Sequence, residues 1–243
     1  MRVILSFLGL LLLVSPAAAQ VVVLRSSIPM QGEYETVLEA SADGESREEK
    51  SDDEDESSFV LGADVLYPID ETLSWGFSAF YGTNLEIDPE EAPKQELGND
   101  LSLRIIGEMN IPLSPKLDMR IRAEGGLYML FFDDDLEDYV DGIEENCDSC
   151  DIDGSPAMGY VIGGGAGLAF KINPGLVGRI DLIHQYIDLD LLSVESTEGD
   201  GEFNLSTSGS RFLLSFGLEF GSAPAVDKAV AQGEGGGAAL PAK

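Results

Sequence analysis

The stretch LDMRIRAEGGLYMLFF, from Leu117 to Phe132, decides the fold of this chain. Its side chains alternate in character at every second position. One face comprises Leu117, Met119, Ile121, Ala123, Leu127, Met129 and Phe131, and the other Asp118, Arg120, Arg122, Glu124 and Tyr128. A period of two belongs to a β-strand whose faces meet different surroundings. The stretch therefore predicts a strand with one apolar and one charged face.

The same alternation recurs along the chain. It predicts strands within residues 58–69, 73–81, 101–113, 157–171, 176–192 and 211–220, and a weaker one at 33–40. With the stretch quoted above, these make eight. The best apolar run after the first twenty residues, Ala157 to Phe170, has fourteen residues and five glycines, too short and too glycine-rich to span a membrane as a helix. We therefore predict an all-β chain.

The connections between the predicted strands are alternately short and long. Three are short proline turns, at residues 68–71, 112–116 and 173–175. Four are long and acidic, at about residues 43–57, 85–99, 133–156 and 194–207. Short turns on one rim and long loops on the other are typical of membrane barrels. The predicted fold is an eight-stranded antiparallel up-and-down transmembrane β-barrel with both termini in the periplasm.

A soluble barrel of the lipocalin type also alternates, so other features must decide where the apolar face points. The charged face carries both signs in mid-strand, and its bases are nearly all Arg, which suits a packed, paired interior. Aromatic residues gather near strand ends, as interfacial girdles do. The last predicted strand, SRFLLSFGLEF, ends in an aromatic residue after alternating large apolar residues. These features favour a face directed toward lipid.

The chain divides into four predicted segments. MRVILSFLGLLLLVSPAAAQ has the basic start, short apolar run and small-residue site of a cleaved secretory signal. We predict a signal peptide at 1–19, a periplasmic lead-in at 20–29, the barrel at 30–220 and a disordered Gly/Ala-rich periplasmic tail at 221–243. Such a chain would be exported to the bacterial outer membrane. Its net charge of −31 makes nucleic acid an implausible partner.

Across residues 30–220 the chain resembles the small eight-stranded outer-membrane β-barrels of the OmpA-like and opacity-protein-like families. The resemblance is carried by GGGAGLAFKINPGLVGRIDLIHQY, from Gly163 to Tyr186, and by the closing strand. It implies that the closing strand bears an assembly signal for the barrel-assembly machinery. The residues of that signal are Phe212, Phe216, Leu218 and Phe220. The tail after Phe220 departs from the pattern, because many family members end at this aromatic residue.

The charged faces of the predicted strands form a candidate lumen network. Its members are Asp64, Arg104, Glu108, Asp118, Arg120, Arg122, Glu124, Lys171, Arg179, Asp181, Arg211 and Glu219. Side chains fill the interior of an eight-stranded barrel, and buried charges of both signs can pair. We therefore expect a structural, salt-bridged lumen. The alternative is a narrow ion or small-solute channel.

The acidic loops are candidates for divalent cations. Residues 133–156 hold eleven carboxylates and no Lys or Arg, and carboxylates are ligands that Ca²⁺ and Mg²⁺ prefer. The candidate ligands are Asp148, Asp151 and Asp153, although a charge run is more often only solvated. Cations could also bridge the loops to lipopolysaccharide phosphates. Cys147 and Cys150, in an exported chain, predict a local disulfide.

The single histidine, His184, raises the question of an enzyme. Some eight-stranded barrels are lipid-modifying enzymes, and by strand parity His184 would face lipid. However, Tyr186 stands where the lipid A deacylases place their hydroxyl nucleophile. We therefore expect no enzymatic activity and no cofactor other than divalent cations. The expected role is structural or surface interaction, with outer-membrane lipids as surroundings and the surface partner open.

Overall fold

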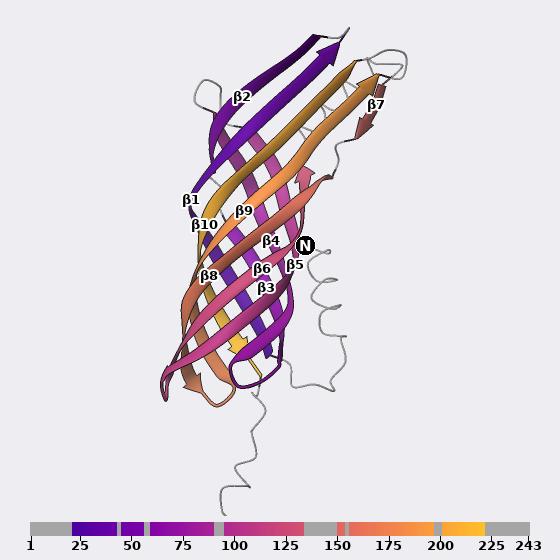
Figure 1. The fold of residues 1–243 in the computed structure, drawn as a ribbon. Helices are drawn as coiled ribbons and strands as arrows, with labels where there is room; N and C mark the ends of the chain where they lie inside the picture. The colour runs from indigo at the N-terminus through magenta and orange to yellow at the C-terminus, as the bar shows by residue number, and fades with distance from the viewer. Residues whose placement is uncertain are drawn as a thin grey trace, which may run out of the picture.

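The computed structural model describes residues 21–42, 45–55, 59–89, 95–133, 150–153, 156–196 and 201–221. They form one antiparallel sheet of ten strands (Figure 1). The strands are β1 Val21–Ala42, β2 Glu45–Asp55, β3 Phe59–Pro68, β4 Leu73–Pro89, β5 Gln95–Ser114, β6 Leu117–Phe132, β7 Cys150–Asp153, β8 Ala157–Asn173, β9 Leu176–Ser196 and β10 Glu202–Phe220. In these ranges, no helix is long and apolar enough to cross a membrane.

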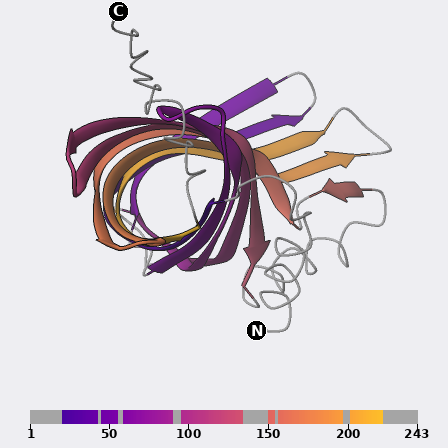
Figure 2. The same ribbon diagram turned by 90° about the horizontal axis from the view of Figure 1, so that it is seen from below.

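The sheet closes into a ring with eight strand positions (Figure 2). β1 pairs with β10 on one side and with β2 and β3 on the other. The first and last strands of the chain are therefore hydrogen-bonded to each other, which closes the sheet. β2 and β3 both pair with β4 as well, which makes them two pieces of one position in the wall. The other neighbours run from β4 through β5, β6, β8 and β9 to β10. The predicted eight-stranded up-and-down barrel is confirmed.

The strands are strongly staggered around the ring. The paired residues that start at Ser26 of β1 lead through every neighbouring strand and return to β1 at Val37, eleven residues further along. Such a stagger requires strands that are tilted against the barrel axis, as Figure 1 shows. It also determines which residues of different strands meet at one level of the interior.

One end of the barrel, called here the turn end, carries the short connections. The three predicted turns lie there, between β3 and β4, β5 and β6, and β8 and β9. β1 begins and β10 ends at the same rim, because Val22 pairs with Phe220. In the last turn Gly175 has φ of 94°, which glycine adopts without strain and which a proline-glycine turn requires at this position. The backbone preferences of proline and glycine thus favour the short turns at this end of the barrel.

The outward face of the barrel is apolar. Its aromatic residues include Trp75, which is 45% exposed and stacks on Tyr67 with ring centroids 5.3 Å apart. Other exposed large apolar side chains on the wall strands are Leu24, Ile28, Phe59, Leu61, Leu73, Phe77, Ile105, Ile121, Leu127, Phe131, Met158, Ile162, Leu168, Ile180, Leu182, Phe212, Phe216, Leu218 and Phe220. A soluble protein buries such residues, whereas a membrane barrel presents them to lipid. The barrel is therefore of the transmembrane type.

Part of the sheet continues beyond the ring at the end opposite the turns. β7, the end of β9, the start of β10, the end of β1 and β2 lie side by side in that order and lean to one side (Figures 1 and 2). We call these five segments the outer sheet. Pairing there runs as far as Cys150 with Ser196 and Ala42 with Glu45. The barrel wall and the outer sheet are one continuous hydrogen-bonded structure.

Two predicted boundaries are wrong. Residues 21–29 are not a periplasmic lead-in, because Val21 to Ser27 pair with β3 and Val22 to Pro29 pair with β10. Much of the expected loop sequence is strand, including residues 45–55, 85–89, 95–99, 194–196 and 202–207. Acidic residues have low strand propensity, but cross-strand pairing overrides it there. Residues 1–20 and 222–243 lie outside the described ranges, as does most of the loop at 133–156.

Candidate functional site

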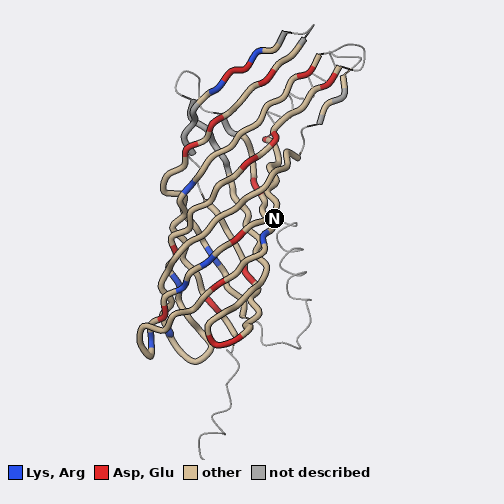
Figure 3. The backbone as a smooth tube through the Cα atoms, in the orientation of Figure 1, with Lys and Arg blue, Asp and Glu red and all other residues tan. Residues whose placement is uncertain are grey.

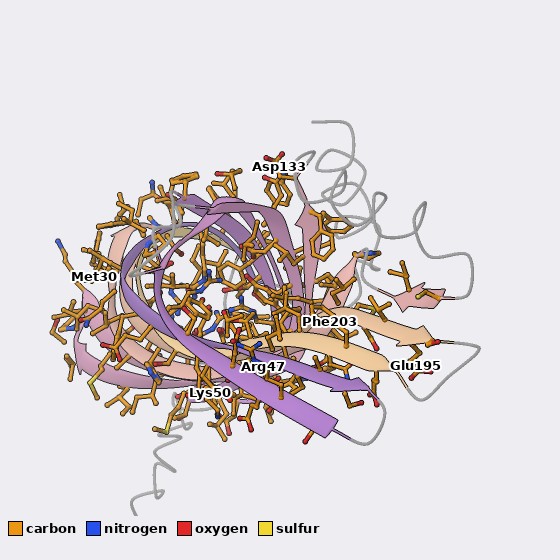
Figure 4. The ribbon with its side chains drawn as sticks, turned by 90° about the horizontal axis from the view of Figure 1, so that it is seen from above. Met30, Arg47, Lys50, Asp133, Glu195 and Phe203 are labelled. Atoms are coloured by element: carbon orange, nitrogen blue, oxygen red, sulfur yellow. The ribbon has the colours of Figure 1, made fainter. Side chains whose placement is uncertain are left out.

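The middle of the lumen is a network of paired charges. Figure 3 shows Lys and Arg beside Asp and Glu within the barrel body, and Figure 4 shows nitrogen atoms gathered inside the ring. The side chains come from alternate residues of β1, β3, β5, β6, β9 and β10, because every second residue of a strand points inward. Burial is nearly complete, with Arg211 and Asp64 at 0% exposure and Arg179 at 2%.

Asp64 is the most heavily bonded carboxylate of this network. Its oxygens accept from Nε of Arg25 at 2.5 Å, from Nη1 of Arg122 at 2.7 Å and from the Ser78 hydroxyl at 2.6 Å. Arg25 also donates to Asp181. Four strands, β1, β3, β4 and β6, therefore meet at one carboxylate.

Glu124 is a second junction, on the side of the network toward the outer sheet. It accepts from Nη1 of Arg104 at 2.5 Å, from Nε of Arg122 at 2.6 Å and from the Gln185 amide at 2.8 Å. The Gln185 carbonyl in turn accepts from Nε of Arg211 at 3.2 Å. A neutral amide thus extends the network to β9 and β10.

A third group lies toward the turn end. Glu108 accepts from Arg179 at 2.5 Å and from Arg120 at 2.9 Å. Glu219 lies 3.4 Å from Arg179 and 3.5 Å from Arg120. Asp118 and Lys171 form a separate pair at 3.4 Å near the turn-end rim, where Lys171 is half exposed. Arg179 also lies 3.5 Å from Asp181, which accepts a hydrogen bond from Arg25. Since Arg25 donates to Asp64 as well, this third group is connected to the junction at Asp64.

Glycines on β8 make room for these long side chains. Gly163, Gly165 and Gly167 pair with Glu124, Arg122 and Arg120 of β6. A Cβ on Gly167 would lie 2.0 Å from Asp181 Oδ1, and one on Gly165 would lie 2.4 Å from a backbone oxygen of β9. The glycine run in the sequence therefore has a packing function. The inward face of β8 carries no side chains along this run, which leaves room for the long side chains of the neighbouring strands.

An apolar cluster closes the interior on the side of the outer sheet. It comprises Tyr34, Leu97, Tyr128, Leu130, Ala157, Val161, Ile187, Leu189 and Leu191, and we call it the apolar plug. Leu130 and Val161 are 0% exposed. A smaller cluster of Val21, Val23, Leu66 and Ile106 lies on one side near the turn end. At these levels the inward face is largely apolar rather than charged, although Asp100 lies there as well, buried opposite Leu130.

The structure brings most of the expected lumen residues together. Asp64, Arg104, Glu108, Arg120, Arg122, Glu124, Arg179, Asp181, Arg211 and Glu219 join one network, and Asp118 and Lys171 pair at its edge. Sequence reasoning missed Arg25, Ser78 and Gln185. Arg25 fell in the supposed lead-in, although its spacing from Val21, Val23 and Ser27 matches an inward face. Gln185 and Ser78 carry no charge, so a search of the polar faces for charged residues did not identify them as members of the lumen network.

The outer sheet is acidic. Its exposed carboxylates include Glu33, Glu35, Glu39, Glu48, Glu49, Asp190, Glu195 and Glu202, against Arg47 and Lys50 as bases among the residues described there. Lys50 lies 2.9 Å from Glu35 and 3.2 Å from Glu48, and its hydrogen bond to Glu35 is the main cause that raises its pKa above the usual value. Figure 4 shows Arg47 and Lys50 on the β1 and β2 side and Glu195 near the end of β9.

The remaining sequence candidates lie apart from the network. His184 is outward and exposed, and its ring centroid is 4.6 Å from that of Phe212. Phe212, Phe216, Leu218 and Phe220 all lie outward on β10.

The candidate metal ligands and the cysteines lie near β7. Asp151 and Asp153 are on this strand, whereas Asp148 and Cys147 lie outside the described residues. Cys150 is disulfide-bonded. Within the described ranges, no group of three or more His, Cys, Asp or Glu residues is arranged to hold a metal ion.

No family model and no curated protein sequence matches the chain. Among solved structures it is similar to the Neisserial surface protein NspA (12% identity, 82% of this chain and 96% of that chain, TM-score 0.42). It is also similar to OprG from Pseudomonas aeruginosa (14%, 85% and 97%, 0.43) and to AlkL (12%, 86% and 92%, 0.46). All three are small outer-membrane β-barrel proteins, the class that the sequence resembles.

Proposed function

We propose that this chain is a non-enzymatic outer-membrane protein whose sealed barrel holds an acidic sheet at the cell surface. The turn end then faces the periplasm and the outer sheet faces outward. The observation that carries the proposal is the filling of the lumen, where paired charges lie next to the buried side chains of the apolar plug. An ion that crossed the barrel would have to push apart the side chains of the apolar plug and break ion pairs of the network. Buried ion pairs are costly to break.

The first test is conductance in planar bilayers. A sealed barrel gives no discrete current steps across a range of voltages and salts. A variant that shortens the plug, Leu130→Ala together with Leu189→Ala, serves as the comparison, since it opens space beside the charged network. Regular current steps from the unaltered protein would contradict the proposal and favour the narrow channel.

The outer sheet supports a role in binding divalent cations. Glu33 and Glu35 of β1 lie just above the apolar band, and Asp188 and Glu35 flank Ser208 in register. A carboxylate band at this level would repel the phosphates of lipopolysaccharide unless divalent cations lie between them. The proposed partners are therefore divalent cations and, through them, lipopolysaccharide.

Calcium titration by calorimetry in lipid nanodiscs tests this role. We expect saturable binding that Glu33→Gln with Glu35→Gln weakens, whereas Glu71→Gln at the turn end leaves it unchanged. Equal binding by all three proteins would exclude Glu33 and Glu35 as the cation ligands, and no binding by the unaltered protein would exclude the outer sheet as the cation surface. Cell fractionation tests the location, and recovery in a soluble fraction would overturn it.

A further inference from the structure

Among the described residues, β7 and β8 pair with different parts of β9, and a cleft lies beside the gap between them. β8 pairs with β9 only as far as Met158 opposite Asp190, and β7 begins to pair at Asp153 opposite Ser193. Leu191 and Leu192 therefore have no partner among the described residues of β7 and β8. The register of β10 on β9 shifts at the same level, between Leu205 and Ser206. A cleft of about 520 Å³ opens at this break, a volume within the range of small-molecule sites.

The floor of this wall cleft is apolar. Leu192 and Ala157 are 6% and 2% exposed, and both line the cleft together with Met158 and Leu205. Ala157 belongs to the apolar plug, and Leu205 packs against that plug. The cleft floor is therefore continuous with the apolar plug and offers an apolar surface for an alkyl chain.

The rim of the wall cleft is acidic and rich in hydrogen-bond acceptors. Glu39 and Asp190 are exposed carboxylates from β1 and β9, and Ser193, Asn204 and Ser206 supply further oxygens. The lining includes no Lys or Arg, and neither carboxylate pairs with a base in the part of the chain that the structure describes. The rim thus matches a positive head group with several N–H donors and disfavours an anion.

We propose that the wall cleft binds a cationic amphiphile, a primary alkylammonium with a chain of moderate length. The ammonium lies between Glu39 and Asp190 and donates to the Ser and Asn oxygens, while the chain lies along Leu192 and Leu205. The site lies just above the apolar outer face of the barrel, so an amphiphile from the outer leaflet reaches it with its chain already out of water. This inference does not depend on the divalent-cation role, because it uses different carboxylates and a cavity.

The experiment is calorimetric titration of the full folded chain in nanodiscs of zwitterionic lipid with octylammonium, after subtraction of empty nanodiscs. We expect one saturable site, binding that strengthens about fourfold per methylene up to decylammonium, and no site for octanoate. Glu39→Gln with Asp190→Asn weakens binding about tenfold, since each exposed charge pair contributes up to about fivefold. Ser206→Trp, which fills the cleft without a change of charge, abolishes it.

The matched control is Glu33→Gln with Glu195→Gln, which removes one carboxylate from each of the same two strands outside the cleft. Its binding stays within twofold of the unaltered protein. Heat-dependent gel mobility confirms that every variant is folded. An equal loss in the control pair, binding of octanoate as strong as that of octylammonium, or no effect of Ser206→Trp would each overturn the proposal.

Discussion

The substitution Asp64→Asn tests whether the lumen is the dry, paired network that the geometry indicates. Asp64 is fully buried and is the common acceptor of Arg25, Arg122 and Ser78. Asparagine keeps the size but removes the charge, so two buried guanidinium groups lose one of their anions. Removal of one partner from a buried ion pair typically costs about 3–5 kcal/mol. We expect a loss of unfolding free energy in this range.

Urea unfolding of the barrel in lipid vesicles measures this loss. The emission of Trp75 reports it, because this is the only tryptophan and it lies on the lipid face. At a slope of about 2 kcal/mol per molar urea, the midpoint falls by about 1.5 to 2.5 M. The matched control is Glu35→Gln, which removes one acid from the exposed pair with Lys50 and costs at most about 1 kcal/mol.

A double variant separates pairing from packing. Arg122→Gln with Asp64→Asn removes both charges of the 2.7 Å contact, so it should cost less than the sum of the two single losses. If Asp64→Asn costs no more than Glu35→Gln, water reaches the network and the reasoning about a sealed lumen is refuted.

Further predictions concern other parts of the barrel. Gly167→Ala places a Cβ against Asp181 and the β9 backbone, and we expect a loss of about 1–3 kcal/mol in the same urea assay; an unchanged midpoint would mean that β8 has room there. Asp70 accepts from the backbone N–H groups of Thr72 at 2.6 Å and Leu73 at 2.7 Å, which lower its pKa. Its contribution to stability is therefore present above pH 4 and lost as the pH falls below the model-peptide value of 3.8. The difference in urea midpoint between the unaltered protein and Asp70→Ala should therefore shrink as the pH is lowered from 4 to below 3.8. A difference that stays constant would contradict the lowered pKa of Asp70. Brominated lipids should quench Trp75 strongly, and the absence of quenching would contradict an apolar face directed toward lipid.

The sequence alone determined the class of fold. Alternation in Leu117 to Phe132 and in its counterparts predicted strands with one apolar face, because a strand's side chains point to opposite sides in turn. Proline and glycine predicted the three turns, since their local backbone preferences do not depend on distant residues. Parity placed Arg104, Arg122 and Glu124 on one face of their strands, and the mixed charges, the aromatic residues near strand ends and the closing strand indicated that this face points inward.

The tertiary structure decided what parity cannot. Parity says which side chains of a strand share a face, but the level of a side chain in the lumen depends on the stagger of the strands. Only the stagger of eleven residues around the ring brings Arg25, Asp64 and Asp181 together from β1, β3 and β9. The same stagger brings the residues of the apolar plug together on the side of the outer sheet. The outer sheet likewise required pairing, because the acidic residues of β2 have little strand propensity of their own. The wall cleft lies where the described parts of β7 and β8 leave two residues of β9 without a partner, and the alternation in the sequence does not predict that position.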